Sequence, residues 1–189
     1  MSRIVAGTAK GRRIATPPGR STRPTTDRVR EALFSSIEAT LGSLQGVHFL
    51  ELYAGSGAVS LEAMSRNAQL ATLVELHPAT AALARRNAVD LGFRAVEVVT
   101  GTVERFVAAQ ATRAYDVVFL DPPYDVANTA VADVLTQLAE HCWLADEALV
   151  VVERSSRTQP LRWPPHFEPL RSRKYGETTL WYGRATGTA

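Results

Sequence analysis

Apolar residues follow two different spacings along the chain. Residues 47–52, 70–75 and 115–120 are short, mostly apolar runs, and each precedes a longer segment in which apolar residues lie three or four positions apart. The short runs predict buried strands, and the longer segments predict helices with one apolar face. Strands that alternate with helices pair in parallel, with helices on both faces of the sheet. The pattern therefore predicts an α/β fold.

Recognisable signals mark where the predicted helices begin and end. Thr25 or Thr26 is expected to cap a first helix that Gly42 ends, and Pro78 begins another that Gly92 ends. In the first of these, apolar residues repeat every four positions and are expected to lie on the sheet. Further helices are expected at 58–66, 103–110 and 128–140, and further strands at 96–99 and 148–152.

The N-terminal end departs from this alternation. Residues 3–7 and 12–16 are short alternating runs, which predict a β-hairpin that the prolines and glycine at 17–19 end. We expect this basic hairpin and its loop, residues 1–22, to be an extension of one main domain formed by residues 23–189.

The C-terminal end also differs. Residues 154–165 are polar and proline-rich, and residues 167–173 and 178–183 then predict two strands joined by Lys174-Tyr175-Gly176. Two strands joined by so short a connection run antiparallel. We expect this pair to complete the sheet in antiparallel fashion.

The composition is that of a globular protein, with 46% hydrophobic and 21% charged residues. No segment is apolar enough to span a membrane and the N-terminus has no apolar run, so we expect a cytoplasmic protein without a secretory signal. Cys142 is the one cysteine, which excludes internal disulfides and cysteine-rich zinc sites. The four histidines lack ligand spacing, so we predict no metal.

Positive charge is concentrated at the N-terminal end, although the net charge is only +2. An arm of this kind is a candidate phosphate-binding surface, because neutralising phosphates releases counterions and steers association. The alternative is a solvated hairpin whose arginines serve solubility. The first thirty residues contain a single acid, Asp27. Their basic residues are Arg3, Lys10, Arg12, Arg13, Arg20, Arg23, Arg28 and Arg30.

A glycine-containing turn, Gly55-Ser56-Gly57, follows the first buried strand and precedes a helix. Such turns let a ligand approach the backbone N–H groups at a helix N-terminus. Ser60 stands where the dinucleotide fingerprint has a third glycine or alanine, so the pattern indicates a nucleoside cofactor without a pyrophosphate. Glu75 ends the next strand, at the spacing where an acid binds ribose hydroxyls. The alternative for the glycine-containing turn is a plain strand-to-helix turn without a ligand. The alternative for Glu75 is an acid on the protein surface.

Asp121-Pro122-Pro123-Tyr124 directly follows the buried strand YDVVFL. Two prolines make the turn rigid. Because proline has no backbone N–H, the turn presents carbonyl oxygens as acceptors without donors beside them. The Asp121 carboxylate and the Pro122 carbonyl could accept both hydrogens of an exocyclic amine on a base, and Tyr124 could stack on that base. The alternative is a structural diproline turn with a core tyrosine.

At four places the chain resembles a known family. The segments are RPTTDRVREALF (23–34), ELYAGSGA (51–58), FLDPPY (119–124) and WLADEALV (143–150). They are similar to the RsmD family of bacterial 16S ribosomal RNA guanine-N2 methyltransferases, which are class I enzymes that use S-adenosylmethionine. The resemblance implies a Rossmann-like, seven-stranded, mostly parallel sheet whose last strand is antiparallel.

The resemblance also implies roles for individual residues. The turn at 121–124 would contact both the cofactor and the target base, and Thr102 or Val103 would read the adenine. The chain departs from the family pattern at Thr100-Gly101-Thr102, where an acid or amide is usual. The implied cofactor residues are Glu51, Tyr53, Gly55, Ser56 and Gly57 at the methionine end, Glu75 and Leu76 near the ribose, and Thr102, Val103 and Asp121. The implied catalytic residues are Asp121, Pro122, Pro123 and Tyr124.

The function predicted from the sequence is methyl transfer from S-adenosylmethionine to guanine N2 in 16S ribosomal RNA, with S-adenosylhomocysteine as the product. The base must be unpaired or flipped out to reach such a site. We expect a monomer that acts on the small ribosomal subunit. One alternative is a DNA adenine-N6 or cytosine-N4 methyltransferase, and another is a non-catalytic RNA-binding assembly factor. A third is modification of a protein glutamine amide, for which asparagine is usual in place of Asp121.

Overall fold

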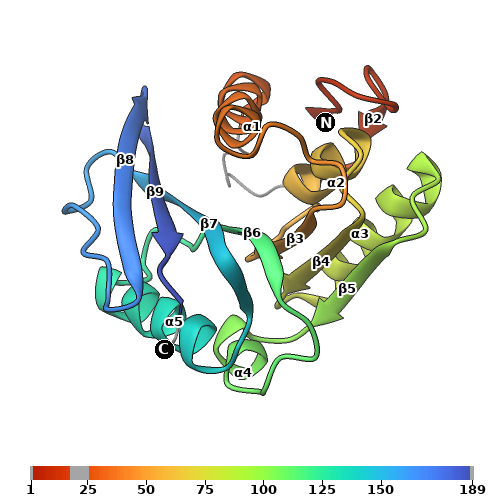
Figure 1. Cartoon of the computed structure of the whole chain (residues 1–189). Coiled ribbons are helices and arrows are strands. Elements are labelled where there is room, and N and C mark those ends of the chain that lie inside the picture. Colours follow the sequence, from red (N-terminus) through yellow and green to blue (C-terminus); the bar gives the residue numbers. More distant parts are fainter. Residues whose placement is uncertain (1, 18–25, 188–189) are drawn as a thin grey trace.

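The computed structural model of the protein is built around one sheet of seven strands and describes residues 2–17 and 26–187 (Figure 1). The strands are β3 (His48–Leu52), β4 (Leu70–Glu75), β5 (Val96–Thr100), β6 (Tyr115–Leu120), β7 (Leu144–Ser155), β8 (Phe167–Tyr175) and β9 (Thr178–Ala185). They lie in the order β5-β4-β3-β6-β7-β9-β8. The chain reverses direction across the sheet between β3 and β6, which is the place where open α/β sheets bind ligands.

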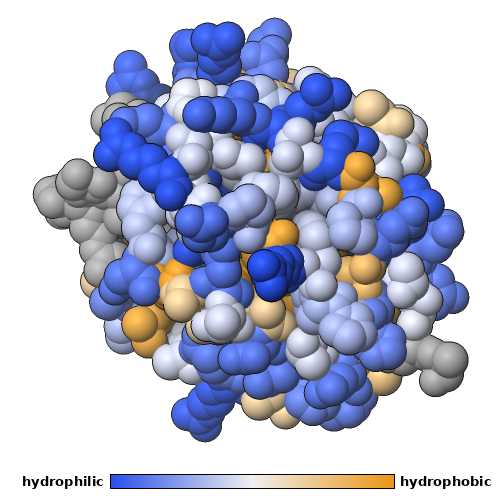
Figure 2. Space-filling view, turned by 90° about the vertical axis from the view of Figure 1, so that its left-hand side faces the viewer, coloured by the Kyte–Doolittle hydropathy of each residue, from blue (hydrophilic) through white to orange (hydrophobic). Residues whose placement is uncertain are grey.

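The first five of these strands are parallel, and β9 is antiparallel to both of its neighbours, β7 and β8. This confirms the predicted α/β sheet with an antiparallel last strand. The pattern did not show that β9 enters between β7 and β8, which leaves β8 at the edge. Figure 2 shows that side of the molecule, where the surface is mostly hydrophilic. Charged side chains on an edge strand oppose pairing with another chain.

Strand β7 is longer than predicted, because it begins at Leu144 rather than Ala148. Its register against β6 is irregular, since Tyr115 pairs with Leu144 but Val117 pairs with Leu149. Glu147 has a φ of 58° at this irregularity. The polar sequence there conceals the start of the strand.

Helices cover both faces of the sheet (Figure 1). No helix in the described ranges is long and apolar enough to cross a membrane. The helices are α1 (Asp27–Leu41), α2 (Ala58–Ser65) and α3 (Pro78–Leu91) on one face, and α4 (Val103–Val107) and α5 (Asn128–Glu140) on the other.

Helix α1 begins as the sequence predicts. The Thr26 hydroxyl accepts a hydrogen bond of 3.3 Å from the Val29 N–H, so Thr26 is its N-cap, while Thr25 lies outside the described residues. The apolar stripe of α1 is buried against the sheet from Val29 to Ile37, but Leu41 at its end is partly exposed. Helix α4 ends at Val107, earlier than the predicted residue 110.

The N-terminal hairpin consists of β1 (Ser2–Arg3) and β2 (Arg13–Ile14), which pair antiparallel. Its Ile4 and Ile14 are buried in a small core with residues of α2 and α3. Gly7 approaches α2 so closely that a Cβ there would lie 1.8 Å from the Ser65 carbonyl oxygen. The hairpin is therefore packed on α2 and α3 and is not detached from the main domain.

Candidate active site

A cleft of about 820 Å³ opens at the carboxyl ends of the parallel strands, where the chain reverses across the sheet. It is large enough for a cofactor or small ligand. The structure brings together here all the predicted cofactor and catalytic residues except Gly57. Those that line the cleft are Glu51, Tyr53, Gly55, Ser56, Glu75, Leu76, Thr102, Val103, Asp121, Pro122, Pro123 and Tyr124.

The glycine turn connects β3 to α2, and its two glycines serve different purposes. Gly55 has a φ of 56° and lines the cleft. Gly57 has a φ of 77°, and a Cβ there would lie 2.5 Å from Cδ2 of Leu73. Gly57 is therefore required by backbone conformation and packing. It lies outside the cleft lining, so the structure gives no support for the predicted contact between Gly57 and the cofactor.

Two buried acids fix this turn. The Glu51 carboxylate accepts a hydrogen bond of 2.8 Å from the Ser60 N–H in the first turn of α2. Glu75 accepts bonds of 2.9 Å from the Gly55 N–H and 2.8 Å from the His77 N–H. Glu75 is only 6% exposed, so it is not a surface acid. Burial raises the pKa of Glu51 to about 7, even though hydrogen bonds from Ser60 and Val59 oppose the shift.

Asp121 follows β6 and lies among other charged groups. Burial raises the pKa of Asp121 well above its ordinary value, and the nearby acids Glu153 and Glu51 raise it further. Arg154 opposes that shift. The carboxyl group is therefore a stronger base than an exposed aspartate when it is ionised.

Arg154, which is 3% exposed on β7, holds the turn that follows Asp121. Its Nη2 donates a hydrogen bond of 2.6 Å to the Val126 carbonyl, and its Nη1 donates one of 3.5 Å to the Pro123 carbonyl. Tyr124 projects at the mouth of the cleft and is 61% exposed. Tyr124 is thus not a core tyrosine.

The loop after β5 forms the far end of the cleft. Thr102 caps α4, because its hydroxyl accepts a hydrogen bond of 3.2 Å from the Arg105 N–H. The sequence lacks an acid at 100–102, but Glu104 lines the cleft and accepts a hydrogen bond of 3.4 Å from the Tyr53 hydroxyl. The sequence signal for Glu104 was an acid shifted by two positions from the place where it was expected.

Most of the predicted basic arm is exposed in the structure, but its members differ. Lys10, Arg13 and Arg28 have exposed side chains. Arg12 donates to the Leu91 carbonyl at 3.2 Å and to the Asp90 carbonyl, and therefore also holds the end of α3. Exposed Arg3 is 3.3 Å from Asp27 in an ion pair. Arg20 and Arg23 lie outside the described residues.

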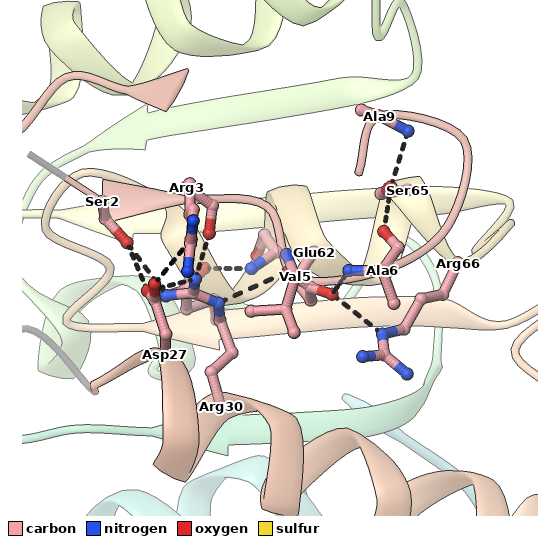
Figure 3. Close-up of polar contacts among 12 residues, drawn as sticks. Ser2, Arg3, Val5, Ala6, Ala9, Asp27, Arg30, Glu62, Ser65 and Arg66 are labelled. Atoms are coloured by element: carbon pink, nitrogen blue, oxygen red, sulfur yellow. Dashed lines mark hydrogen bonds and ion pairs between the residues drawn. The ribbon is translucent and has the colours of Figure 1, made fainter. Parts of the chain in front are cut away.

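The structure contradicts the prediction that Arg30 is part of the phosphate-binding arm. Its side chain has no exposed surface, and it lies between the hairpin, α1 and α2 (Figure 3). The guanidinium is 2.9 Å from Asp27 and 3.4 Å from Glu62, and it donates to the Arg3 carbonyl. The prediction that Arg30 binds RNA is wrong, because a buried guanidinium held by two carboxylates cannot reach a phosphate.

Comparison with known proteins places the chain among related sequences. A family model described as "Conserved hypothetical protein 95" matches residues 2–184. The chain is 36% identical over 172 residues to the "Ribosomal RNA small subunit methyltransferase D" of Escherichia coli strain K12, which covers 89% of this chain and 84% of that protein.

Two solved structures show the same fold. A putative methyltransferase from Escherichia coli, yhhF, superposes with a TM-score of 0.86 at 30% identity and covers 99% of each chain. An RNA methyltransferase from Salinibacter ruber, solved in complex with S-adenosyl-L-homocysteine, has a TM-score of 0.67 at 18% identity and covers 88% of this chain and 95% of that one. These likenesses confirm the predicted Rossmann-like fold of class I S-adenosylmethionine-dependent methyltransferases.

Proposed function

The chain belongs to the RsmD family, and from this premise we propose that it transfers a methyl group from S-adenosylmethionine to the exocyclic N2 of a guanine in 16S ribosomal RNA. The observation that carries the proposal is one cleft that holds both the acid-anchored glycine turn and the turn at Asp121–Tyr124. A cofactor bound at the glycine turn and an amine bound at the second turn would therefore lie next to each other in this cleft. The products would be N2-methylguanosine and S-adenosylhomocysteine. We further propose that the protein acts as a cytoplasmic monomer on the small ribosomal subunit.

The residues of the cleft fit this cofactor. Buried Glu51 and Glu75 would repel a pyrophosphate but suit the ammonium and sulfonium charges and the ribose hydroxyls. Glu75 already accepts two backbone N–H groups, yet its two oxygens retain lone pairs for hydroxyls. When bound, S-adenosylmethionine supplies an electrophilic methyl carbon on a positively charged sulfur. Glu51, Tyr53, Gly55 and Ser56 would hold its methionine end, Glu75 and Leu76 its ribose, and Thr102 and Val103 its adenine.

The residues of the turn would prepare the amine. The Asp121 carboxylate and the Pro122 carbonyl accept its two hydrogens, which directs the nitrogen lone pair toward the cofactor end of the cleft. The bound cofactor would supply its methyl carbon to the amine nitrogen, and the electron pair of the broken carbon–sulfur bond would remain on sulfur. The nitrogen then releases a proton to Asp121 or to water. Tyr124 stacks on the unpaired base, and Arg154 keeps the turn in place.

Cofactor binding should strengthen as the pH rises and level off above about pH 7, where buried Glu51 is ionised. Below that pH, Glu51 is mostly protonated, so the ammonium group of the ligand binds a neutral carboxyl group unless the carboxyl first releases its proton. The dissociation constant should therefore fall about tenfold per pH unit up to neutrality. Calorimetric titration with S-adenosylhomocysteine at a series of pH values between about 5.5 and 8.5 measures how the dissociation constant changes with pH. Glu51→Gln should bind weakly with no such slope, and a variant that kept the slope would contradict the assignment.

Charge reversal at Lys10 and Arg13 should weaken RNA binding and flatten its salt dependence. Both side chains are exposed on the hairpin, so each could neutralise a phosphate. The double variant should lower the slope of log K against log salt by about 2. Titration of a 16S RNA fragment at several salt concentrations measures the slope. Arg113→Glu, in the loop before β6 at the opposite end of the strands, is the matched control, and an unchanged slope in the double variant would place the RNA surface elsewhere.

Methylation of RNA from cells that lack the protein tests the proposed function directly. Small subunits and duplex DNA are incubated with labelled S-adenosylmethionine, and the modified nucleoside is identified by mass spectrometry. We expect N2-methylguanosine in 16S RNA. Label that entered only DNA would establish the DNA methyltransferase instead, and a protein that bound RNA but no S-adenosylhomocysteine would be the non-catalytic factor.

A further inference from the structure

The end of the N-terminal hairpin forms part of the cofactor cleft. Thr16 and Pro17, which follow β2 after Ala15, line the same cleft as Glu75 and Asp121. The same short hairpin carries the exposed Lys10 and Arg13. One small element thus contributes to the cleft and also presents the candidate phosphate contacts.

The hairpin is fastened to α2, the helix that begins at the glycine turn (Figure 3). Glu62 accepts hydrogen bonds of 2.7 Å from the Val5 N–H and 2.9 Å from the Ala6 N–H. The Ser65 hydroxyl donates to the Ala6 carbonyl at 2.6 Å and accepts from the Ala9 N–H at 2.9 Å. A shift of the hairpin would therefore pull on the helix whose N-terminus is part of the cleft.

Asn87 of α3 joins the hairpin to the glycine turn itself. Its Oδ1 accepts a hydrogen bond of 3.0 Å from the Ala15 N–H, and its Nδ2 donates to the Ala15 carbonyl at 3.0 Å. The same Nδ2 donates to the Ser56 carbonyl at 3.1 Å. Asn87 is 3% exposed, so both amide hydrogens and the amide oxygen are satisfied inside the protein. The three bonds require an amide, because a carboxylate in this place would face two carbonyl oxygens without hydrogens to donate.

We infer that Asn87 is a positioning residue that holds the hairpin and the glycine turn in one arrangement, so that cofactor binding in the cleft and RNA binding on the hairpin strengthen each other. The inference rests on the proposed function. A ligand that contacts Thr16, Pro17 or Ser56 stabilises the docked hairpin, and the docked hairpin presents Lys10 and Arg13 in a fixed place. The docked state is the one that both ligands favour, and coupling between two sites acts equally in both directions.

The coupling is measured on the intact protein by titration of S-adenosylhomocysteine with and without a saturating 16S RNA fragment. RNA should tighten S-adenosylhomocysteine binding by about tenfold, and S-adenosylhomocysteine should tighten RNA binding by the same factor. In Asn87→Asp the undocked state gains population, so both affinities should weaken and the factor should rise above that of the wild type. Asn67→Asp, the same change at an exposed asparagine, should leave the factor as in the wild type.

The outcomes separate this inference from the proposed function. Wild-type protein that binds both ligands with a factor of 1 would overturn the coupling and leave the methyltransferase proposal standing, whereas wild-type protein that binds no S-adenosylhomocysteine would overturn both. An Asn87→Asp protein with the affinities and the factor of the wild type would also overturn the role of Asn87. If that variant does not fold, hydrogen exchange of the Ala15 amide in the wild type decides: S-adenosylhomocysteine should slow it, and an unchanged rate would overturn the inference.

Discussion

Replacement of Asp121 by alanine is expected to slow methyl transfer about a thousandfold while leaving the affinity for RNA nearly unchanged. The carboxylate is the proposed acceptor for one amine hydrogen and for the proton released, whereas the contacts to phosphates are made by the basic hairpin. Single-turnover methylation of small subunits measures the transfer step, and filter binding measures the affinity.

Variants of neighbouring residues sharpen this test. Asp125→Ala removes an exposed acid from the same loop and should cost little. Asp121→Asn keeps the shape of the side chain but cannot take a proton, and should be nearly as slow as the alanine variant. Equal loss of transfer and of RNA affinity in Asp121→Ala would instead mean that the carboxyl group is structural.

The wild-type rate should also depend on pH through the same carboxyl group. Burial, Glu153 and Glu51 raise the pKa of Asp121, so the acceptor form exists only above that raised pKa. Transfer should therefore be lost as the pH falls through it, and the residual rate of Asp121→Asn should lack this loss. A decline on the alkaline side alone would contradict the role of the ionised form.

Much of the site could be predicted from the sequence because its residues follow strand ends. Parallel strands end at the same edge of a sheet, so the residues after β3, β4 and β6 had to meet there once the alternation was recognised. The turns at 55–57 and 121–124 and the acid Glu75 all lie in the cleft for this reason. Local sequence also predicted a cap at Thr25 or Thr26, and Thr26 is the residue that caps α1.

Contacts between distant parts of the chain could not be predicted. Arg30 belongs to a basic run, and only the arrival of Glu62, 32 residues later, shows that its charge is balanced inside the protein. Thr16 and Pro17 end a hairpin whose docking depends on α2 and α3. Asn87 lies within a helix, and nothing in its own surroundings in the sequence marks it as a link to Ala15 and Ser56.

Replacement of Glu62 by alanine is expected to lower the free energy of unfolding by about 3–5 kcal/mol. The side chain of Glu62 is fully buried and lies 3.4 Å from Arg30 and 3.0 Å from Arg66. Its loss removes one carboxylate of buried Arg30 and leaves the N–H groups of Val5 and Ala6 without their acceptor. Urea denaturation at neutral pH measures the change.

The acid Glu38 offers a matched control, because it binds the same Arg66 at 3.1 Å from a side chain that is 40% exposed. Glu38→Ala should cost less than about 1 kcal/mol, since a partly exposed ion pair contributes little. Glu62→Gln should fall between the two variants, because its single amide oxygen can still accept from one hairpin N–H. If Glu62→Ala cost no more than Glu38→Ala, the hairpin would be held by its apolar contacts with α2 and α3, and the buried charges would not determine its position.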